Sequence, residues 1–325
     1  MRILVTGGAG YIGSVVSEYL LDEGHQVIIA DDLSTGHRDA VDKRAEFFEL
    51  NLFDSESLEG ILADGIEAVC HFAAFSRVGE SMANPLKYYR NNVCGAISLL
   101  DSMKRAGVPL FLFSSTAAVY GEPETIPITE DSSLNPVNPY GNTKLAVERL
   151  LEDCSSAWGL KSLSLRYFNA AGATELHGED HNPESHLIPL VLDVVEGKRE
   201  ELIVFGDDYP TEDGTCIRDY IHVKDLATAH LLGLEKLSEG YSGALNLGGG
   251  RGVSVLEIVK AVSKVTGKKV NYTVGARRRG DPVSLVASSE RAYSVLGWKR
   301  VFSEIENIIE DASNWRKNFP KGYRK

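Results

Sequence analysis

Cysteine is scarce in this chain of 325 residues, which contains only four. Cys70, Cys94, Cys154 and Cys216 lie far apart, and no two of them form a C-x-x-C pair. Thiolate zinc sites and the disulfide frameworks of small secreted domains both depend on closely spaced cysteines. We therefore predict neither a metal site nor a disulfide framework, and we expect the thiols to be structural.

Positive charge is also in short supply, because 34 lysines and arginines face 46 aspartates and glutamates, which gives a net charge of −12. Proteins that bind nucleic acids or anionic membrane surfaces do so through a basic footprint. The sequence therefore predicts no nucleic-acid partner and no membrane partner. An anionic ligand would have to be held by a local group of cations.

The chain has no hydrophobic run long enough to span a bilayer, and Met1-Arg2-Ile3-Leu4-Val5 leads directly into glycines rather than into a signal sequence. It shows no low-complexity segment and no repeat at solenoid periods. With 43% hydrophobic and 25% charged residues, it has the composition of a soluble globular protein. We expect a cytoplasmic protein with two lobes.

What the sequence does contain begins with a glycine-rich segment after a short aliphatic run at 2–6. Gly8, Gly10 and Gly13 satisfy G-x-G-x-x-G, and a helical pattern follows through 15–21. Glycine is needed where the backbone must approach a pyrophosphate held at a helix N-terminus. The pattern of strand, glycine turn and helix therefore predicts a dinucleotide site.

Two acidic residues follow the second predicted strand, which covers 26–30. Asp31 stands 18 residues after Gly13, and Asp32 comes next. A carboxylate at this point can bind the adenosine ribose hydroxyls, and it repels the 2′-phosphate of NADP. The sequence therefore favours NAD, although a tight turn followed by a solvated acidic loop would produce the same letters.

Further strands are predicted at 46–50, 67–73 and 109–114, separated by helical patterns at about 56–63 and 86–106. This alternation predicts an α/β fold with a Rossmann-type, doubly wound parallel sheet and a ligand at the carboxyl ends of its strands. Beyond about residue 170 the loops lengthen. We therefore predict an NAD-binding domain over 1–170, to which some later segments return, and a smaller α/β substrate-binding lobe over 171–325.

Tyr140 and Lys144 follow Pro139 and would lie one turn apart on the same face of a helix. A free phenol with a pKa of about 10 is only about 0.1% ionised at pH 7, and a nearby cation can lower that pKa by roughly 1–3 units. The pair could then act as a general base. Such a pair is often only a solvated surface pair, but the hydroxyls of Ser114, Ser115 and Thr116 and the glycine-rich start favour catalysis.

Seven segments together resemble the extended short-chain dehydrogenase/reductase family, over nearly the whole chain. The glycine loop and the Tyr140/Lys144 pair are common to that whole family, whereas the loop at 208–215 and the triplet at 218–220 are more specific to its nucleotide-sugar epimerases. The segments are Thr6–Gly13, His71–Ala74, Tyr88–Val93, Ser114–Gly121, Pro139–Lys144, Arg166–Gly172 and Phe205–Thr215.

The resemblance implies an isomerase that interconverts UDP-galactose and UDP-glucose without net redox change. Tyr140 would remove the proton of the sugar 4-hydroxyl while a hydride passes from C4 to NAD, and the hydride would return to the other face of the 4-keto sugar. Thr116 would hydrogen-bond the 4-oxygen. Lys144 would hold the nicotinamide ribose and, with the positive charge of the nicotinamide, lower the pKa of Tyr140.

The same resemblance implies which residues surround NAD, and it implies a homodimer packed through helices near 86–106 and 145–158. Around the cofactor the sequence departs from the family pattern in two places. Asn51 stands where an aspartate is common, and Ser76, with Arg77 beside it, replaces a frequent lysine. The implied cofactor-binding residues are Gly7, Gly10, Tyr11, Ile12, Asp31, Asp32, Asn51, Leu52, Phe72, Ala73, Ala74, Asn91, Ser114, Tyr140, Lys144 and Tyr167.

On the substrate side, Arg218 and Arg278 would grip the diphosphate. His186 replaces a common asparagine. Leu285 is intermediate between the bulky and the small residues found there, so UDP-N-acetylhexosamines are alternative substrates. Epimerisation at another position, or of a UDP-uronic acid, is a separate alternative that the sequence leaves open. The implied substrate-binding residues are Thr116, Tyr140, Asn169, His186, Leu187, Arg218, Arg278 and Asp281.

Two other functions fit the sequence less well. A nucleotide-sugar dehydratase of the same family would carry an Asp-Glu pair where this chain has Ala117-Ala118, and alanines move no protons. A non-catalytic, NAD-sensing regulator is possible on the same fold, but it has no need for Thr116, Tyr140 and Lys144 together.

Overall fold

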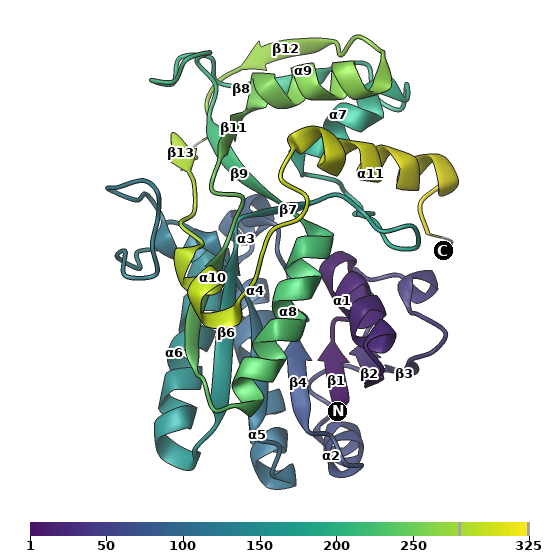
Figure 1. Ribbon diagram of the computed structural model, residues 1–325, viewed down its shortest axis with the longest axis vertical. Coiled ribbons are helices and arrows are strands. Elements are labelled where there is room, and N and C mark those ends of the chain that lie inside the picture. Colours follow the sequence, from purple (N-terminus) through teal and green to yellow (C-terminus); the bar gives the residue numbers. More distant parts are fainter. Residues whose placement is uncertain (279–280, 324–325) are drawn as a thin grey trace.

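The computed structural model describes residues 1–278 and 281–323, which form a large lower lobe and a smaller upper lobe (Figure 1). The lower lobe is built around one sheet with helices on both faces. Among the helices in the described ranges, none combines the length and hydrophobicity needed to cross a bilayer.

The central sheet has seven strands in the order β10-β6-β5-β4-β1-β2-β3. Every neighbouring pair is parallel, which confirms the predicted doubly wound sheet. Parallel strands end at a common edge, so the turns that follow β1, β4, β5 and β6 meet there. The strands are β1 (Arg2–Thr6), β2 (Gln26–Asp31), β3 (Glu46–Glu49), β4 (Ala68–His71), β5 (Leu110–Thr116), β6 (Lys161–Tyr167) and β10 (Gly243–Leu247).

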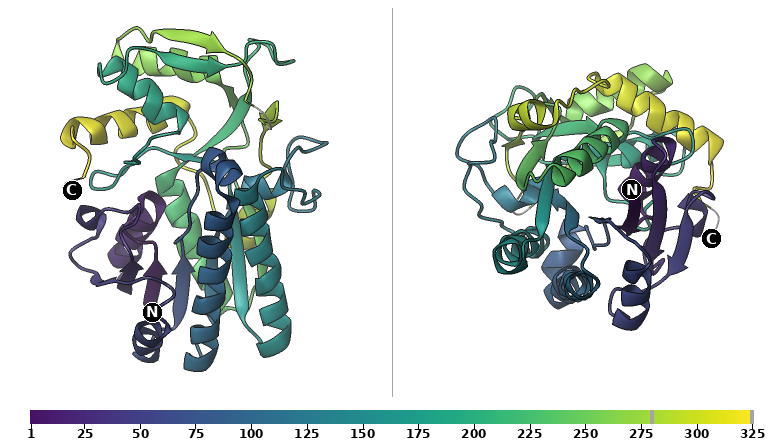
Figure 2. Two further views of the ribbon diagram at one scale, coloured as in Figure 1. Left: turned by 180° about the vertical axis from the view of Figure 1, so that it is seen from behind. Right: turned by 60° about the horizontal axis from the view of Figure 1, so that its bottom comes forward.

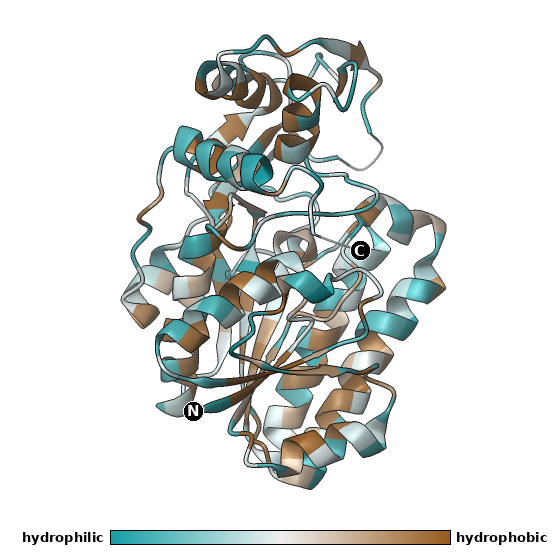
Figure 3. Ribbon diagram, turned by 90° about the vertical axis from the view of Figure 1, so that its right-hand side faces the viewer, coloured by the Kyte–Doolittle hydropathy of each residue, from teal (hydrophilic) through white to brown (hydrophobic). Residues whose placement is uncertain are grey.

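Both faces of this sheet are buried along its central strands, which explains why these strands are largely hydrophobic along their length, whereas the edge strand β3 is mostly exposed (Figure 3). Ile3 and Val5 of β1 pack into one core with α1 and α8, whereas Leu4, between them, faces a second core with α2, α5 and α6. This alternation follows from the two-residue period of a strand. The helices are α1 (Tyr11–Asp22), α2 (Ser55–Ala63), α5 (Gly95–Ala106), α6 (Pro139–Trp158) and α8 (Val223–Ser238).

The upper lobe lies beyond the carboxyl ends of the large sheet (Figure 1). In it, β9 pairs with β7, β11 and β13, and β8 pairs with β12. Its elements are β7 (Asn169–Ala171), α7 (Leu187–Val195), β8 (Leu202–Phe205), β9 (Ile217–His222), β11 (Gly252–Ser254), α9 (Val255–Thr266), β12 (Tyr272–Gly275), β13 (Ser284–Leu285) and α11 (Ile305–Asn318).

The chain crosses between the lobes more than once. After β9 it returns to the lower lobe as α8 and β10, and later as α10 (Glu290–Leu296), which packs against both. Short helical segments complete the lower lobe. They are α3 (Val78–Ala83), α4 (Pro85–Tyr88), the π-helical turn η2 (Tyr89–Cys94), and the 3₁₀ turns η1 (Arg38–Ala40) and η3 (Ala117–Tyr120).

Asp219 of β9 links the segment that follows β10 to the segment that follows β13. Its buried carboxylate accepts backbone N–H groups from Gly249 at 2.5 Å and from Gly250 and Ala287 at 3.0 Å each. A Cβ atom on Gly248 would lie 2.5 Å from Asp219 Oδ2. The three consecutive glycines therefore let the backbone turn close around this carboxylate.

A buried ion pair fixes α6 to the centre of the sheet. Arg166 of β6 donates from Nη2 to Glu148 of α6 at 2.6 Å, and the two side chains are 6% and 5% exposed. Ser115 of β5 donates to the same carboxylate. Both ions lose their contact with water on burial, and each is stabilised by the other. Removing one partner therefore leaves an uncompensated buried charge.

We expect Glu148→Gln to lower the free energy of unfolding by about 3–5 kcal/mol because it isolates the Arg166 guanidinium. Urea denaturation followed by circular dichroism measures this loss. The control is Glu306→Gln, which removes an exposed pair with Lys264 and should cost no more than about 1 kcal/mol. Equal losses in the two variants would contradict a structural role for the buried pair.

Candidate active site

The glycine loop after β1 is shaped by close backbone approaches. Gly7 has φ +75°, and a Cβ there would lie 2.4 Å from Ala73 N, while a Cβ on Gly13 would lie 2.3 Å from Gly7 O. Helix α1 begins at Tyr11 with Gly10 as its N-cap, and no side chain caps it. Backbone N–H groups at such a helix start can bind an anionic group, so this loop fits a pyrophosphate.

The two acidic residues after β2 have different environments. Asp31 is buried and accepts the backbone N–H groups of Ala9 at 3.0 Å and Leu33 at 2.9 Å. Burial raises its pKa, and these hydrogen bonds oppose the rise. Asp32 is exposed and accepts from Asn51 Nδ2 at 2.8 Å. Asp31 therefore fixes the glycine loop, whereas the exposed Asp32 and Asn51 are hydrogen-bonded to each other.

The carboxyl ends of β4, β5 and β6 supply the predicted wall of the cofactor site. Thr6 O accepts the N–H groups of Phe72 at 2.8 Å and Ala73 at 3.0 Å, which ties the end of β4 to the glycine loop. Tyr167 Oη lies 2.9 Å from His230 Nε2, and the ring centroids of Phe72 and His230 are 5.0 Å apart. Phe72, Tyr167 and His230 therefore pack together at the ends of β4 and β6.

Tyr140 and Lys144 lie in the first turns of α6, as predicted. The protein alone, however, does not lower the pKa of Tyr140 as the sequence led us to expect. Lys144 is 3% exposed and donates from Nζ to the backbone oxygen of Ser114 at 2.6 Å. Burial raises the pKa of Tyr140 to about 12, opposed by a hydrogen bond with Thr116. Burial also lowers the pKa of Lys144 to about 7, opposed by Glu148. Desolvation is therefore the largest influence on the pKa of both groups.

The start of α6 is held by residues that sequence reasoning did not single out. Asn92, 2% exposed, donates to Phe75 O and to Thr143 Oγ1, both at 3.0 Å, and accepts from Phe75 N at 2.9 Å. Ser81 Oγ accepts the backbone N–H of Tyr140 at 3.2 Å. Asn92 lies in the π-helical turn η2, and such turns are frequent at functional sites. The one feature of the sequence that could have identified Asn92 is an asparagine inside a predicted helix.

The predicted substrate residues are distributed over the upper lobe. Arg218 of β9 forms an ion pair with Asp281, and the Arg278 guanidinium lies 4.0 Å from the centre of the Phe205 ring. Asn169 is the first residue of β7, opposite Tyr220 of β9. The structure therefore brings Arg218 and Asp281 into contact and leaves Arg278 stacked on an aromatic face.

His186 and Leu187 stand at the start of α7, and their surroundings differ. Leu187 is the first residue of the helix and packs against the core of the upper lobe. His186 precedes it, and its Nδ1 lies 2.5 Å from Glu179 Oε1 and 3.3 Å from Glu184 Oε1. His186 is predicted to bind substrate, but its Nδ1 atom already contacts two carboxylates.

Comparison with known proteins gives consistent matches. The model of the NAD dependent epimerase/dehydratase family matches residues 3–248. The chain is 50% identical to UDP-glucose 4-epimerase of Lacticaseibacillus casei, over 99% of each chain. It is similar to a crystal structure of UDP-glucose 4-epimerase, with 52% identity, a TM-score of 0.97 and complete coverage of both chains. It is also similar to the Brucella ovis UDP-glucose 4-epimerase in complex with NAD, with 46% identity, 96% and 97% coverage and a TM-score of 0.93.

We expect Gly13→Ala to abolish retention of NAD, because the added methyl group would displace the Gly7 carbonyl and distort the pyrophosphate loop. Isothermal titration with NAD measures the effect. Gly60→Ala is the matched control, since Gly60 lies inside α2 with nothing near its Cβ position, and it should gain about 0.5–1 kcal/mol of stability. NAD binding by Gly13→Ala equal to that of the control would contradict this account of the loop.

Proposed function

Because the chain belongs to the NAD dependent epimerase/dehydratase family, we propose that Tyr140, Thr116 and Lys144 carry out C4 epimerisation in it. The activity is the NAD-dependent interconversion of UDP-glucose and UDP-galactose, an isomerase reaction. The observation that supports the proposed roles is the position of Tyr140, half-buried and hydrogen-bonded to Thr116 at the carboxyl end of β5.

NAD, when bound, supplies a reversible acceptor for the hydride of the sugar C4. Tyr140 takes the proton of the 4-hydroxyl, and Thr116 hydrogen-bonds the same oxygen. For this step the pKa of Tyr140 has to fall from about 12 toward neutrality, which requires positive charge near the phenol. Lys144 contributes such charge only while it is protonated, and its contact with the Ser114 carbonyl keeps its ammonium group within the site.

The nucleotide end of the substrate anchors the sugar while it turns over in the site. Arg218 and Arg278 bind the diphosphate, and binding energy gained there is independent of which face of the sugar is presented. Asn169, Leu187 and Asp281 line the sugar and uridine side. The ion pair between Arg218 and Asp281 orients the guanidinium for this task.

The residues after Thr116 argue against a dehydratase. Ala117 and Ala118 form the start of η3, and the backbone N–H of Ala118 donates to Thr116 Oγ1 at 3.2 Å. Neither alanine can transfer a proton to a departing hydroxyl group. The short turn instead positions the threonine hydroxyl.

We also propose that two copies of the chain pack through the face that carries α4, α5 and α6. Figure 2 shows α5 and α6 on the same side of the sheet. Leu86 is 82% exposed and Ile97 48% exposed, and Met82 and Tyr89 are exposed nearby. Contiguous exposed apolar residues of this kind mark interaction sites.

Analytical ultracentrifugation tests the homodimer. The wild type should sediment as a dimer, and Ile97→Glu should shift the equilibrium toward the monomer, because it places a charge in the apolar contact. Val301→Glu, at an exposed apolar position outside this face, should leave the dimer intact. A monomeric wild type at micromolar concentration would exclude the proposed interface.

The catalytic roles are tested by assaying purified protein with UDP-galactose and following UDP-glucose. Tyr140→Phe should reduce kcat by on the order of 10²–10⁴, because the proton acceptor is removed, and the NAD content of the variant is measured in parallel to separate this effect from loss of cofactor. Tyr272→Phe, which alters an exposed tyrosine of β12, is the control. Full activity of Tyr140→Phe would refute the assignment.

The same assay separates the substrate alternatives. UDP-N-acetylgalactosamine and UDP-galacturonate are measured alongside UDP-galactose. Preference for either of them would shift the proposal to that sugar and make Leu285 of β13 the first position to vary.

A further inference from the structure

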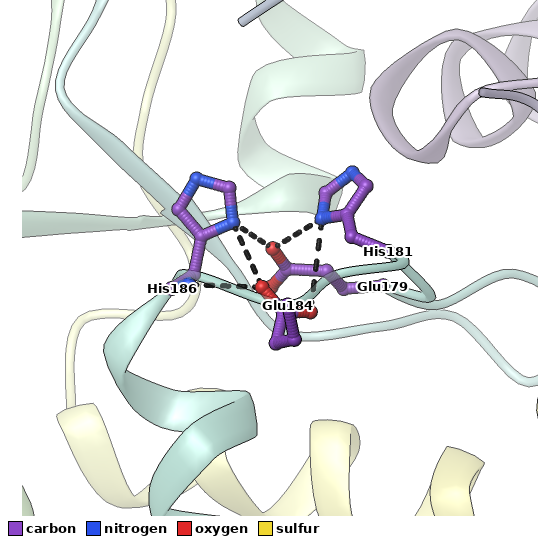
Figure 4. A group of neighbouring side chains, drawn as sticks. All are labelled: Glu179, His181, Glu184 and His186. Carbon is purple, nitrogen blue, oxygen red and sulfur yellow. Dashed lines mark hydrogen bonds and ion pairs between the residues drawn. The ribbon is translucent and has the colours of Figure 1, made fainter. Parts of the chain in front are cut away.

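Four side chains of one loop converge outside the reaction centre. Glu179, His181, Glu184 and His186 lie in the segment between β7 and α7 and point toward a common space (Figure 4). One nitrogen or oxygen atom of each lies within 4.8 Å of the others. The spacing E-x-H-x-x-E-x-H had no place in the function inferred from the sequence, apart from His186.

The distances between these atoms lie on both sides of the spacing of a small tetrahedral site, and the short contact between Glu179 and His186 would have to open for an ion to enter. Glu179 Oε1 lies 3.1 Å from His181 Nδ1 and 2.5 Å from His186 Nδ1. Glu184 Oε2 lies 3.7 Å from His181 Nδ1, and its Oε1 lies 3.3 Å from His186 Nδ1. Tetrahedral zinc bound by nitrogen and oxygen at about 2.0–2.2 Å places its ligand atoms about 3.3–3.5 Å apart.

The imidazole of His181 gives an independent indication. Its Nδ1 is shared between two carboxylates, at 3.1 Å from Glu179 Oε1 and 3.7 Å from Glu184 Oε2. In Figure 4 the Nδ1 atoms of both histidines face the carboxylate oxygens. A nitrogen aimed between two oxygens, rather than at one of them, is arranged as it would be around a central cation.

The chemistry of the four groups identifies the ion. We propose that Glu179, His181, Glu184 and His186 form a structural Zn²⁺ site. Two imidazoles with two carboxylates match the donor preferences of zinc, whereas magnesium and calcium prefer oxygen ligands throughout. One divalent ion also balances the two carboxylate charges, which lie on side chains only 7% and 13% exposed.

The surroundings supply the outer contacts and the access that a metal site needs. Glu184 Oε1 accepts the backbone N–H groups of Ser185 at 2.7 Å and His186 at 2.8 Å, which fixes this carboxylate. A cavity of about 280 Å³ borders the group, lined by Glu179, His181 and Glu184 on one side and by Trp315 and Arg316 of α11 on the other. An ion can therefore reach the site from solvent.

The position of the site indicates what the metal does. The His181 ring lies edge-on to the Tyr11 ring, with centroids 6.4 Å apart, and Tyr11 Oη donates to Gly172 O at 2.6 Å. Tyr11 begins α1 directly after the glycine loop, and His186 immediately precedes α7. A bound ion would clamp the loop that joins the cofactor side of the molecule to the upper lobe.

The rival interpretation is a metal-free network in which two protonated histidines balance the two glutamates. The experiment removes metal from the full-length protein with a chelator and titrates it with Zn²⁺ alone, in competition with a chromophoric indicator. Parallel titrations use Co²⁺, whose visible bands report tetrahedral coordination. The variants are His181→Gln and Glu184→Gln, and Glu175→Gln, an exposed residue of the same loop, is the matched control.

We expect one Zn²⁺ per chain, an intense tetrahedral Co²⁺ spectrum and a higher Tm with zinc. His181→Gln and Glu184→Gln should weaken zinc binding by on the order of 100-fold or more, since even outer contacts of zinc sites cost 10–100-fold, and Glu175→Gln should match the wild type. The site is refuted if the wild type binds no zinc, or if all three variants bind it equally. Should a variant fail to fold, the Co²⁺ spectrum of the wild type decides, because a weak octahedral spectrum contradicts the proposal.

Discussion

Desolvation at the start of α6 is the constraint around which the reaction site is arranged. Tyr140 and Lys144 leave water when the first turns of this helix pack against the end of β5, and each group then resists becoming charged. The structure meets part of this cost with the Ser114 carbonyl, which accepts from Lys144, and with Thr116, which hydrogen-bonds Tyr140. These contacts do not offset the full cost of ionising Tyr140, which therefore needs further positive charge before it can act as a base.

The rest of the lower lobe serves to keep this arrangement in place. The Glu148–Arg166 pair fixes the middle of α6 to the sheet, and Asn92 and Ser81 fix its beginning. The glycine loop brings the pyrophosphate site to the same sheet edge, where Thr6 joins it to Phe72 and Ala73. The glycine loop and the proposed catalytic residues therefore lie along one edge of the same sheet, an arrangement that favours preorganised chemistry.

The fold of the first half of the chain could be predicted from local sequence patterns. Continuous aliphatic strands, glycines at fixed spacing and the Pro139 helix start are sufficient to predict the parallel sheet and the positions of Tyr140 and Lys144. The return of α8, β10 and α10 to the lower lobe depends on tertiary packing, so no local pattern specifies which segments return. The same holds for Asn92 and for the group around Glu179, whose significance arises only when separate turns are brought together. The sequence also could not predict whether the pKa of Tyr140 is raised or lowered, because that depends on how deeply the side chain is buried.

The measurement that tests the account most directly is the titration of Tyr140 in the holoenzyme. Ultraviolet difference titration of wild type against Tyr140→Phe would be recorded with oxidised and with reduced nicotinamide bound. If positive charge at the nicotinamide compensates for burial, the pKa of Tyr140 should be lower by roughly 1–3 units in the oxidised form. The same pKa in both forms would contradict the account, since burial would then be offset by some other group.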